Sequence, residues 1–424
     1  MLDIQFIRNN SDKAKWAAEV KGEDDVDIDQ LLGWDKKWRK YLQELESLRA
    51  ERNSTSGKIG EKKRAGENAE DLIQRMRKVN EQIDVLEDKV RKLKANIDQS
   101  MLRVPNIPHS SVPIGETEQD NVVIDKWGEL PNFSFEPEAH WDLGPNLGIM
   151  DFERAAKITG SRFSILQRNG ARMVRALINF MLDLHVDEHG YTEIYPPFMV
   201  NRKSMIGTAQ LPKFEEDAFL IDKFDYFLIP TSEVPVTNMY RDEILDREDL
   251  PNKFVAYSPC FRAEAGSAGR DTRGLIRQHQ FDKVELVHYT EPEYSYDALE
   301  EIRKNAEVVL QRLNIPYQVT TMCTGDMGFA QSKKYDLELW MPSYNDYVEI
   351  SSVSNFEDFQ ARRAGIRYRP ESDASTKFIH TLNGSGVAIG RCLASIVENY
   401  QQEDGTVVIP ESLRPYMGDK KLIK

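Results

Sequence analysis

Two runs of apolar residues, spaced alternately four and three positions apart, constrain the fold of this chain most strongly. The first run, in which Arg52 fills one slot, consists of Trp34, Trp38, Tyr41, Leu45, Leu48, Thr55 and Ile59. The second run consists of Leu72, Met76, Val79, Ile83, Leu86, Val90, Leu93 and Ile97. This spacing predicts two helices, each with one narrow apolar seam. Since the polar segment 62–68 between them contains a glycine and suits a tight reversal, we predict an antiparallel helical hairpin (coiled-coil arm) about 50 Å long.

The hairpin is also the basic part of an acidic chain. Residues 35–94 hold 17 lysines and arginines and 12 aspartates and glutamates, a net charge of +5, whereas the whole chain of 424 residues carries −14. A solvated coiled coil whose charges only keep it in solution explains this balance. Taken alone, the charge favours this interpretation, and a projecting arm that contacts a nucleic-acid backbone is the alternative that it leaves open.

The composition is typical of a folded protein from a reducing compartment. Hydrophobic residues make up 40% of the chain and charged residues 30%, which excludes wholesale disorder. Cys260, Cys323 and Cys392 lie far apart, so they suggest neither a disulfide framework nor a zinc site. The sequence shows no secretory leader and no apolar run near the roughly 20 residues of a membrane span. We therefore expect a soluble, cytoplasmic protein with no membrane partner.

The sequence pattern changes after Pro105. We interpret residues 1–104 as a helical domain, 105–127 as a linker and 128–424 as a second domain. Candidate strands in the second domain cover 226–229, 254–257, 281–289, 335–341 and 347–352. Long helical stretches cover 171–189, 293–313 and 386–402. Because most strands follow one another without a crossover helix, we predict an α+β fold with a mainly antiparallel sheet flanked by helices.

The segment 261–281 carries the clearest chemical pattern. A strand ends in a polar, glycine-rich loop, and another strand follows it. The loop contains four arginines, at Arg262, Arg270, Arg273 and Arg277. A guanidinium fork can hold two phosphate oxygens at once. The loop therefore suits phosphate binding, although an ordinary exposed hairpin has the same outline.

The strand after this loop places several side chains on one face. Phe281, Lys283, Glu285 and Val287 alternate along it, which puts Phe281 and Glu285 about 13 Å apart. This distance suits a site with an aromatic base at one end and a small cation at the other. Taken alone, however, the pattern favours a core position for Phe281 and a surface position for Glu285.

A third stretch, residues 381–391, is rich in small residues and leads into an apolar helix. We place Arg391 in the second turn of that helix. A helix start or a packing contact is the commoner explanation of such glycines. They would also let the backbone approach a ligand closely, with Arg391 in reach of a phosphate.

These three stretches, together with Tyr195-Pro196-Pro197 after a long helix, resemble motifs 1, 2 and 3 of the class II aminoacyl-tRNA synthetases. The finer resemblance is to the bacterial type of the seryl-tRNA synthetase family, and it covers essentially the whole chain. It rests on the hairpin and on six short motifs in order, at 231–235, 261–266, 325–328, 335–338, 349–352 and 358–363. The resemblance implies a class II fold with an N-terminal arm that binds tRNA.

The resemblance implies an ATP site. Arg262 resembles the arginine that holds the α-phosphate and the substrate carboxylate. Glu264 resembles the acid that helps to fix adenine, and Phe281 the ring that stacks on it. Arg277 and Arg391 resemble the arginines that grip the terminal phosphates. The full set of implied ATP-binding residues is Arg262, Ala263, Glu264, Arg277, Phe281, Glu349, Ile350, Ser351, Ser352 and Arg391.

The resemblance also implies a metal site and a serine pocket. Glu349 and Ser352 resemble the ligands of a catalytic Mg²⁺, and no zinc is expected. Strict alternation would put these two residues on opposite faces of a strand, so a shared metal needs a bulge or a strand end there. The implied serine-binding residues are Thr231, Ser232, Glu233, Arg262, Glu285, Asn383 and Ser385. Val353 and Phe356 replace two cysteines frequent in the family, and we expect both to be packing positions.

The implied reaction is the activation of L-serine with ATP, followed by transfer of serine to the 3′ end of tRNA(Ser). Catalysis by Arg262, Arg277, Arg391 and Mg²⁺ would consist of positioning and charge stabilisation. The family further implies tRNA(Sec) as a partner and a homodimer. Three alternatives stay open: a ligase that loads an amino acid onto a carrier protein, a non-catalytic RNA-binding relative, and a related synthetase for proline or threonine. The long arm argues against the first, and the retained site residues argue against the second.

Overall fold

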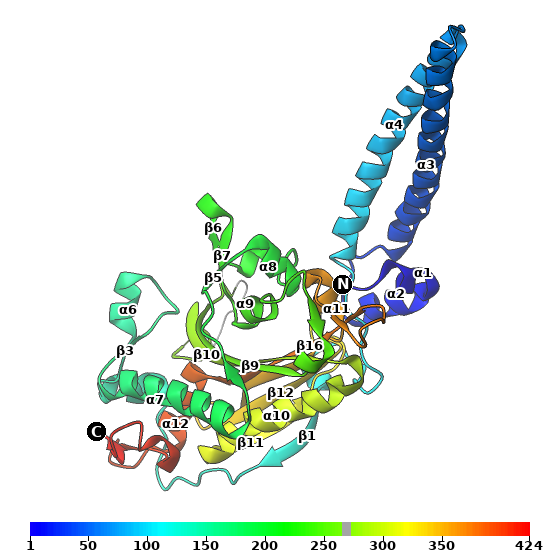
Figure 1. Ribbon diagram of the computed structural model, residues 1–424. Coiled ribbons are helices and arrows are strands. Elements are labelled where there is room, and N and C mark those ends of the chain that lie inside the picture. Colours follow the sequence, from blue (N-terminus) through cyan, green and yellow to red (C-terminus); the bar gives the residue numbers. More distant parts are fainter. Residues whose placement is uncertain (265–272) are drawn as a thin grey trace. The chain divides into compact units, whose positions relative to one another are not determined.

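The computed structural model describes residues 1–264 and 273–424 (Figure 1). It divides into two compact units. One unit consists of residues 2–19 and 23–105, and the other of residues 1, 20–22 and 106–424. In the part of the chain so described, no helix is long and apolar enough to cross a membrane.

The first unit contains the predicted hairpin. Its helices are α1 (Ile4–Asn9), α2 (Ser11–Val20), α3 (Ile28–Arg64) and α4 (Glu70–Met101). Asp27 caps α3 by accepting a hydrogen bond from the backbone N–H of Gln30. After α3 the chain reverses through Gly66, whose φ of +74° is readily adopted by glycine.

The two long helices bury the predicted seams against each other. The buried cluster comprises Leu45, Met76, Val79, Ile83 and Leu86. Ion pairs connect the two helices along their exposed sides, from Arg49 to Glu87 at 2.7 Å and from Arg75 to Glu51 at 2.6 Å. The prediction of two helices with a reversal between them is confirmed.

An eight-stranded sheet forms the framework of the second unit. Its strand order is β1-β11-β12-β13-β16-β10-β9-β4, and all neighbours are antiparallel except β4, which runs parallel to β9. Its strands are β1 (Val122–Trp127), β4 (Thr192–Glu193), β9 (Asn252–Phe261), β10 (Gln280–Thr290), β11 (Tyr317–Thr321), β12 (Lys333–Met341), β13 (Asp346–Asn355) and β16 (His380–Ala388). The predicted α+β class is confirmed.

Short strands form four smaller sheets in the described ranges. They are β2 (Met150–Asp151) with β3 (Ile165–Leu166); β5 (Met199–Asn201), β7 (Tyr226–Leu228) and β6 (Leu220–Ile221); β15 (Lys377–Phe378), β14 (Arg367–Arg369) and β8 (Ile244–Asp246); and β17 (Val407–Val408) with β18 (Leu422–Ile423).

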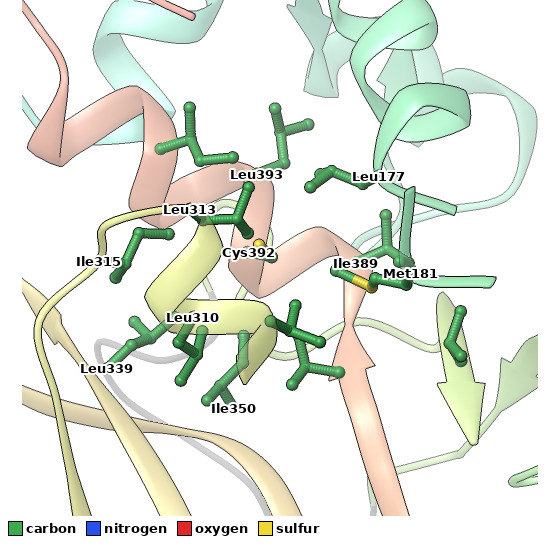
Figure 2. Packing of buried hydrophobic residues seen from close by; sticks show 14 of the residues in the cluster. Leu177, Met181, Leu310, Leu313, Ile315, Leu339, Ile350, Ile389, Cys392 and Leu393 are labelled. Carbon is green, nitrogen blue, oxygen red and sulfur yellow. The ribbon is translucent and has the colours of Figure 1, made fainter. Parts of the chain in front are cut away.

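Helices cover both faces of the large sheet (Figure 1). One face packs against α7 (Asn169–Asp183), α10 (Ser295–Arg312) and α12 (Ile389–Asn399), and a π-helical turn (Leu184–Glu188) extends α7. Figure 2 shows part of this main core, in which Leu310 of α10 lies beside Leu339 and Ile350 of the sheet, and Leu177 and Leu393 lie on the far side of Cys392. The remaining helices are α5 (His140–Asn146), α6 (Phe152–Ile158), α8 (Arg202–Gly207), α9 (Glu233–Thr237) and α11 (Phe359–Ala364).

The opposite face of the sheet is only partly covered, by α9 and α11. Val236 of α9 and Ala361 of α11 belong to a buried cluster with Val287 and Tyr289 of β10. Side chains alternate along a strand. Val284 and Leu286 of β10 therefore enter the main core. The alternate residues of β10, such as Glu285 and Val287, face the side of α9 and α11, where part of the sheet is uncovered.

Two sequence expectations differ from the structure. Of the predicted linker, residues 105–127, all but Pro105 belong to the sheet unit. The strand β1 pairs with β11, and the backbone N–H groups of Asn106 and His109 donate to the carbonyls of Phe329 and Ser332. The prolines of this segment end the helix, but the segment is not a flexible linker, because its backbone forms hydrogen bonds to the sheet unit.

The stretch 386–388, predicted to begin a helix, is the end of β16. The helix α12 begins at Ile389, which puts Arg391 in its first turn and not in its second. The glycines allow close packing: a Cβ on Gly384 would lie 2.5 Å from Ile302 Cγ2, and one on Gly386 would lie 2.7 Å from His185 Nε2.

Candidate active site

A cavity of about 520 Å³ lies on the open face of the sheet. Most of the site residues expected from the sequence line it, although they come from six separate segments. These lining residues are Thr231, Glu233, Arg262, Glu264, Arg277, Phe281, Glu285, Glu349, Ile350, Ser352, Asn383, Ser385 and Arg391.

Three expected residues, Ser232, Ser351 and Ala263, are not among the residues that line the cavity. Ser232 is fully buried and hydrogen-bonds the hydroxyl of Ser258 at 2.6 Å. Ser351 donates from its hydroxyl to the carbonyl of Ser385 at 2.6 Å, which ties β13 to β16. The backbone N–H of Ala263 donates to the carbonyl of Asp217 at 2.9 Å. These contacts support the residues that line the cavity.

One end of the cavity combines an aromatic ring with cationic groups. The strands β9 and β10 pair up to Phe261 and Gln280, so Arg262 follows directly beside the start of β10. The Arg262 guanidinium lies 5.2 Å from the centre of the Phe281 ring, and its Nε donates to the carbonyl of Pro230 at 3.3 Å. The expectation of a core position for Phe281, taken from the strand pattern alone, is therefore wrong.

The arginine loop is described only in part. Arg277 forms an ion pair with Glu264 at 3.3 Å within the cavity wall, and Arg273 is exposed. Arg270 lies outside the described residues, as does the rest of 265–272. Of the three arginines that the structure describes, Arg262 and Arg277 line the cavity.

A bulge in β13 brings Glu349 and Ser352 together. In the pairing of β12 with β13, Glu338 faces Glu349 and Leu337 faces Ser351, which skips Ile350. The Ser352 hydroxyl consequently donates to Glu349 Oε1 at 3.2 Å. The bulge that a shared metal site would require is confirmed, since two residues that strict alternation would separate lie in contact.

Nearby cations keep Glu349 ionised. Burial alone would raise the pKa of Glu349, but the charges of Arg391 and Lys334 outweigh it and hold the pKa below its ordinary value. Lys334 also forms an ion pair with the buried Asp336 at 3.1 Å. In the described ranges, no group of three or more histidines, cysteines or carboxylates is arranged to hold a metal ion.

Two buried carboxylates, with different partners, occupy the other end of the cavity. Glu285 is 2% exposed, forms an ion pair with Lys283 at 2.6 Å and accepts a hydrogen bond from Ser385 at 3.4 Å. The surface position expected for Glu285 from the strand pattern alone is therefore wrong. Glu233 is 7% exposed and accepts a hydrogen bond from the neutral amide of Gln360 at 2.6 Å. Burial, and then the charge of Glu285, raise the pKa of Glu233 to about 7.

Sequence reasoning missed three residues of this site. Lys283 was placed on the correct strand face but received no role, although its ion pair with Glu285 follows from their spacing of two. Lys334, which lines the cavity, gave no comparable signal. Gln360 lies in the motif at 358–363 but received no role, because only packing between distant segments brings it to Glu233 behind the cavity wall. Val353 is fully buried in the main core, as predicted, whereas the buried Phe356 also borders the cavity.

The antiparallel sheet, with arginines, an aromatic ring and buried carboxylates in one cavity, defines a class II aminoacyl-tRNA synthetase. The family model "tRNA synthetase class II core domain (G, H, P, S and T)" matches residues 214–400, and "Seryl-tRNA synthetase N-terminal domain" matches residues 1–108. The chain belongs to the seryl-tRNA synthetase family.

Relatives match this chain from end to end. It is 59% identical to a serine–tRNA ligase of Clostridium tetani over 100% of both chains, and 60% identical to one of Thermoanaerobacter pseudethanolicus over 98% of both. The seryl-tRNA synthetase of Pyrococcus horikoshii, solved in complex with ATP, superimposes with a TM-score of 0.94 at 42% identity, covering 100% of this chain and 99% of that one.

More distant structures share the fold. The cytoplasmic serine–tRNA ligase of Naegleria fowleri, solved with AMP, gives a TM-score of 0.88 at 30% identity, over 100% of this chain and 99% of that one. The prolyl-tRNA synthetase of Giardia lamblia gives 0.55 at 15% identity, over 68% of this chain and 58% of that one.

Proposed function

We propose that this protein is a serine–tRNA ligase, which activates L-serine with ATP and transfers it to tRNA(Ser). The observation that carries the proposal is the cavity, which joins a ring and arginines at one end to two buried carboxylates at the other. The first end suits a nucleotide and the second suits the ammonium group of an amino acid. The end-to-end similarity to serine–tRNA ligases selects serine among the amino acids.

The nucleotide end would act by positioning and charge stabilisation. Phe281 would stack on the adenine, and Glu264 would help to fix it. Arg262 would hold the α-phosphate together with the serine carboxylate, while Arg277 and Arg391 would hold the terminal phosphates. A carboxylate oxygen bonds to the α-phosphorus as the bond to the pyrophosphate oxygen breaks. Since the nucleophile is already an anion, no general base is needed.

Glu349 and Ser352 fit a magnesium ion in this scheme. Mg²⁺ prefers oxygen ligands, often one or two carboxylates together with substrate phosphates. The bulge supplies a carboxylate and a hydroxyl 3.2 Å apart, and the neighbouring cations keep the carboxylate ionised. The bound ion would neutralise phosphate charge.

The carboxylate end would select serine by its polar groups. Glu233 and Glu285 supply negative charge, and Thr231, Asn383 and Ser385 supply short polar side chains around it. A pocket that bonds the serine hydroxyl rejects alanine, because its own groups would then stay unpaired. Threonine would be rejected by size.

The second step would transfer serine from the adenylate to the 3′ end of tRNA. We assign the helical hairpin to tRNA binding, because it carries net positive charge in an acidic chain and lies within the region matched by the family's N-terminal domain. We extend the proposal to tRNA(Sec), to a homodimer and to the cytoplasm. Three free, buried cysteines fit a reducing compartment.

Transfer of labelled serine to bulk bacterial tRNA, with ATP and Mg²⁺, tests this function. Charging is expected with serine and not with alanine or threonine. Serine-dependent ATP–pyrophosphate exchange without charging would instead indicate a different acceptor, such as a carrier protein. Absence of both activities would overturn the ligase function itself.

A further inference from the structure

A short chain of buried side chains holds the Glu233 carboxylate from behind. The amide Nε2 of Gln360, on α11, donates to Glu233 Oε1 at 2.6 Å. The amide Oε1 of Gln360 in turn accepts from the hydroxyl of Thr381 at 2.7 Å. Gln360 is 1% exposed and Thr381 is fully buried, so water does not compete for these two bonds.

These residues lie one layer behind the cavity wall. Thr381 precedes Asn383 and Ser385 on the same face of β16, since side chains alternate along a strand. Asn383 and Ser385 line the cavity, whereas Thr381 bonds to Gln360. A second hydrogen bond, to the backbone carbonyl of Thr208 at 3.3 Å, anchors the same amide nitrogen. The orientation of the amide is thus fixed by an acceptor on one side and a donor on the other.

The amide positions Glu233 without neutralising it. Glu285 has an ammonium partner within the protein, Lys283, at 2.6 Å. Gln360 donates a hydrogen bond to Glu233 but adds no positive charge. Lys283 and Arg262 also act on the Glu233 carboxylate as nearby charges, but its negative charge can still attract a cation that enters the cavity, such as the α-ammonium group of an amino acid.

We propose that Gln360 is a positioning residue that sets the affinity for the amino acid by aiming the Glu233 carboxylate at its ammonium group. The inference rests on the proposed function, in which Glu233 belongs to the serine pocket. The inference adds to the serine pocket a residue of α11 that does not itself touch the substrate. The buried hydrogen bond between Gln360 and Thr381 then has a functional role besides packing.

The variant Gln360→Met tests the inference, because methionine is similar in size and has no N–H donor. In ATP–pyrophosphate exchange with the full chain, we expect the KM for serine to rise about tenfold or more, as loss of a hydrogen bond to a charged group implies. The KM for ATP should change less than twofold. The pH at which serine affinity is half-maximal should also rise, because Glu233 loses a donor that favours its charged form.

Two further variants separate positioning from packing. Thr381→Val should raise the KM for serine in the same direction by a smaller factor, and it keeps the inference testable if Gln360→Met folds poorly. Gln401→Met is the matched control: Gln401 is also buried, but its amide bonds to backbone groups of Glu138 and Glu398, away from the cavity lining. It should lower the melting temperature and leave the KM for serine unchanged.

The outcomes are distinguishable. An unchanged KM for serine in Gln360→Met, or an equal rise for serine and ATP, overturns the positioning role while the proposed function stands. Absence of serine-dependent exchange in the unaltered chain overturns the proposed function, and the inference fails with it.

Discussion

The helical hairpin and the sheet unit bury their apolar residues in different ways. In the hairpin, α3 contacts the next helix along the chain, and one seam of side chains supplies the whole core. In the sheet unit, neighbours come from distant parts of the chain: Val122 of β1 pairs with Thr321 of β11, and Lys283 of β10 with Ala388 of β16. Contacts between neighbouring segments of the chain form the hairpin, whereas contacts between segments far apart in the sequence form the cavity.

This difference matches the chemistry of the two regions. The hairpin presents lysines and arginines along exposed helix surfaces, which suits a long polyanion whose binding needs charge more than fixed geometry. The sheet unit holds few groups at fixed distances, such as Glu349 and Ser352 at 3.2 Å, which suits the positioning of reacting atoms. We therefore expect that a change in the hairpin leaves serine activation intact, and that a change in the cavity leaves tRNA binding intact.

Deletion of residues 35–97 should have the largest effect. We expect tRNA charging to fall by about 1000-fold or more, because a protein that loses several phosphate contacts loses affinity on that scale. Serine-dependent ATP–pyrophosphate exchange should stay within about twofold of the full chain, since no deleted residue lines the cavity. Parallel assays of both steps measure this, and charging retained by the shortened protein would refute the role of the arm.

The variant Arg262→Ala should produce the opposite pattern. Removal of a charge that stabilises the transition state typically lowers the rate about 100- to 1000-fold, so exchange and charging should both fall by this factor. Binding of tRNA, measured by filter retention, should be unchanged. Arg49→Ala, which removes an exposed arginine of the hairpin, is the control for exchange. Weak tRNA binding by Arg262→Ala would mean that the two regions are not independent.

The sequence predicts the hairpin better than the site, because the contacts of the hairpin are local in the sequence and those of the site are not. A seam such as Leu45 with Ile83 is visible in the spacing of neighbouring residues, because each helix repeats its contacts every turn. The bulge at Ile350 could be inferred only from the requirement that Glu349 and Ser352 meet. Gln360 lies in the motif at 358–363, but its role gave no signal, because its contact with Glu233 depends on how α11 packs against α9 and β16. The helix start near Gly386 was misplaced, since glycines packed tightly within a strand resemble those that begin a helix.

A smaller effect, on local stability, should distinguish the core of the hairpin from the main core of the sheet unit. Ile83→Ala in the hairpin and Leu177→Ala in the main core each remove a buried side chain, at 2% and 0% exposure, and each should cost about 2–5 kcal/mol. In Ile83→Ala we expect local opening of the hairpin, with weaker charging and normal exchange. In Leu177→Ala we expect a lower melting temperature for the sheet unit. Hydrogen exchange resolved by segment measures both, and protection lost from both units in Ile83→Ala would contradict the comparison.

The pH dependence of serine binding should give the smallest effect. Burial and Glu285 raise the pKa of Glu233 to about 7, and an ammonium group binds to the ionised carboxylate. The ionised fraction grows from about one tenth at pH 6 to about nine tenths at pH 8, so the KM for serine should fall about tenfold over this range. Glu233→Gln should bind serine weakly at both pH values and lose this dependence.

The protein without residues 35–97 should keep the same pH profile as the full chain, because Glu233 and its partners Gln360 and Glu285 all belong to the sheet unit. A profile that changes with the deletion would show that the arm influences the pocket.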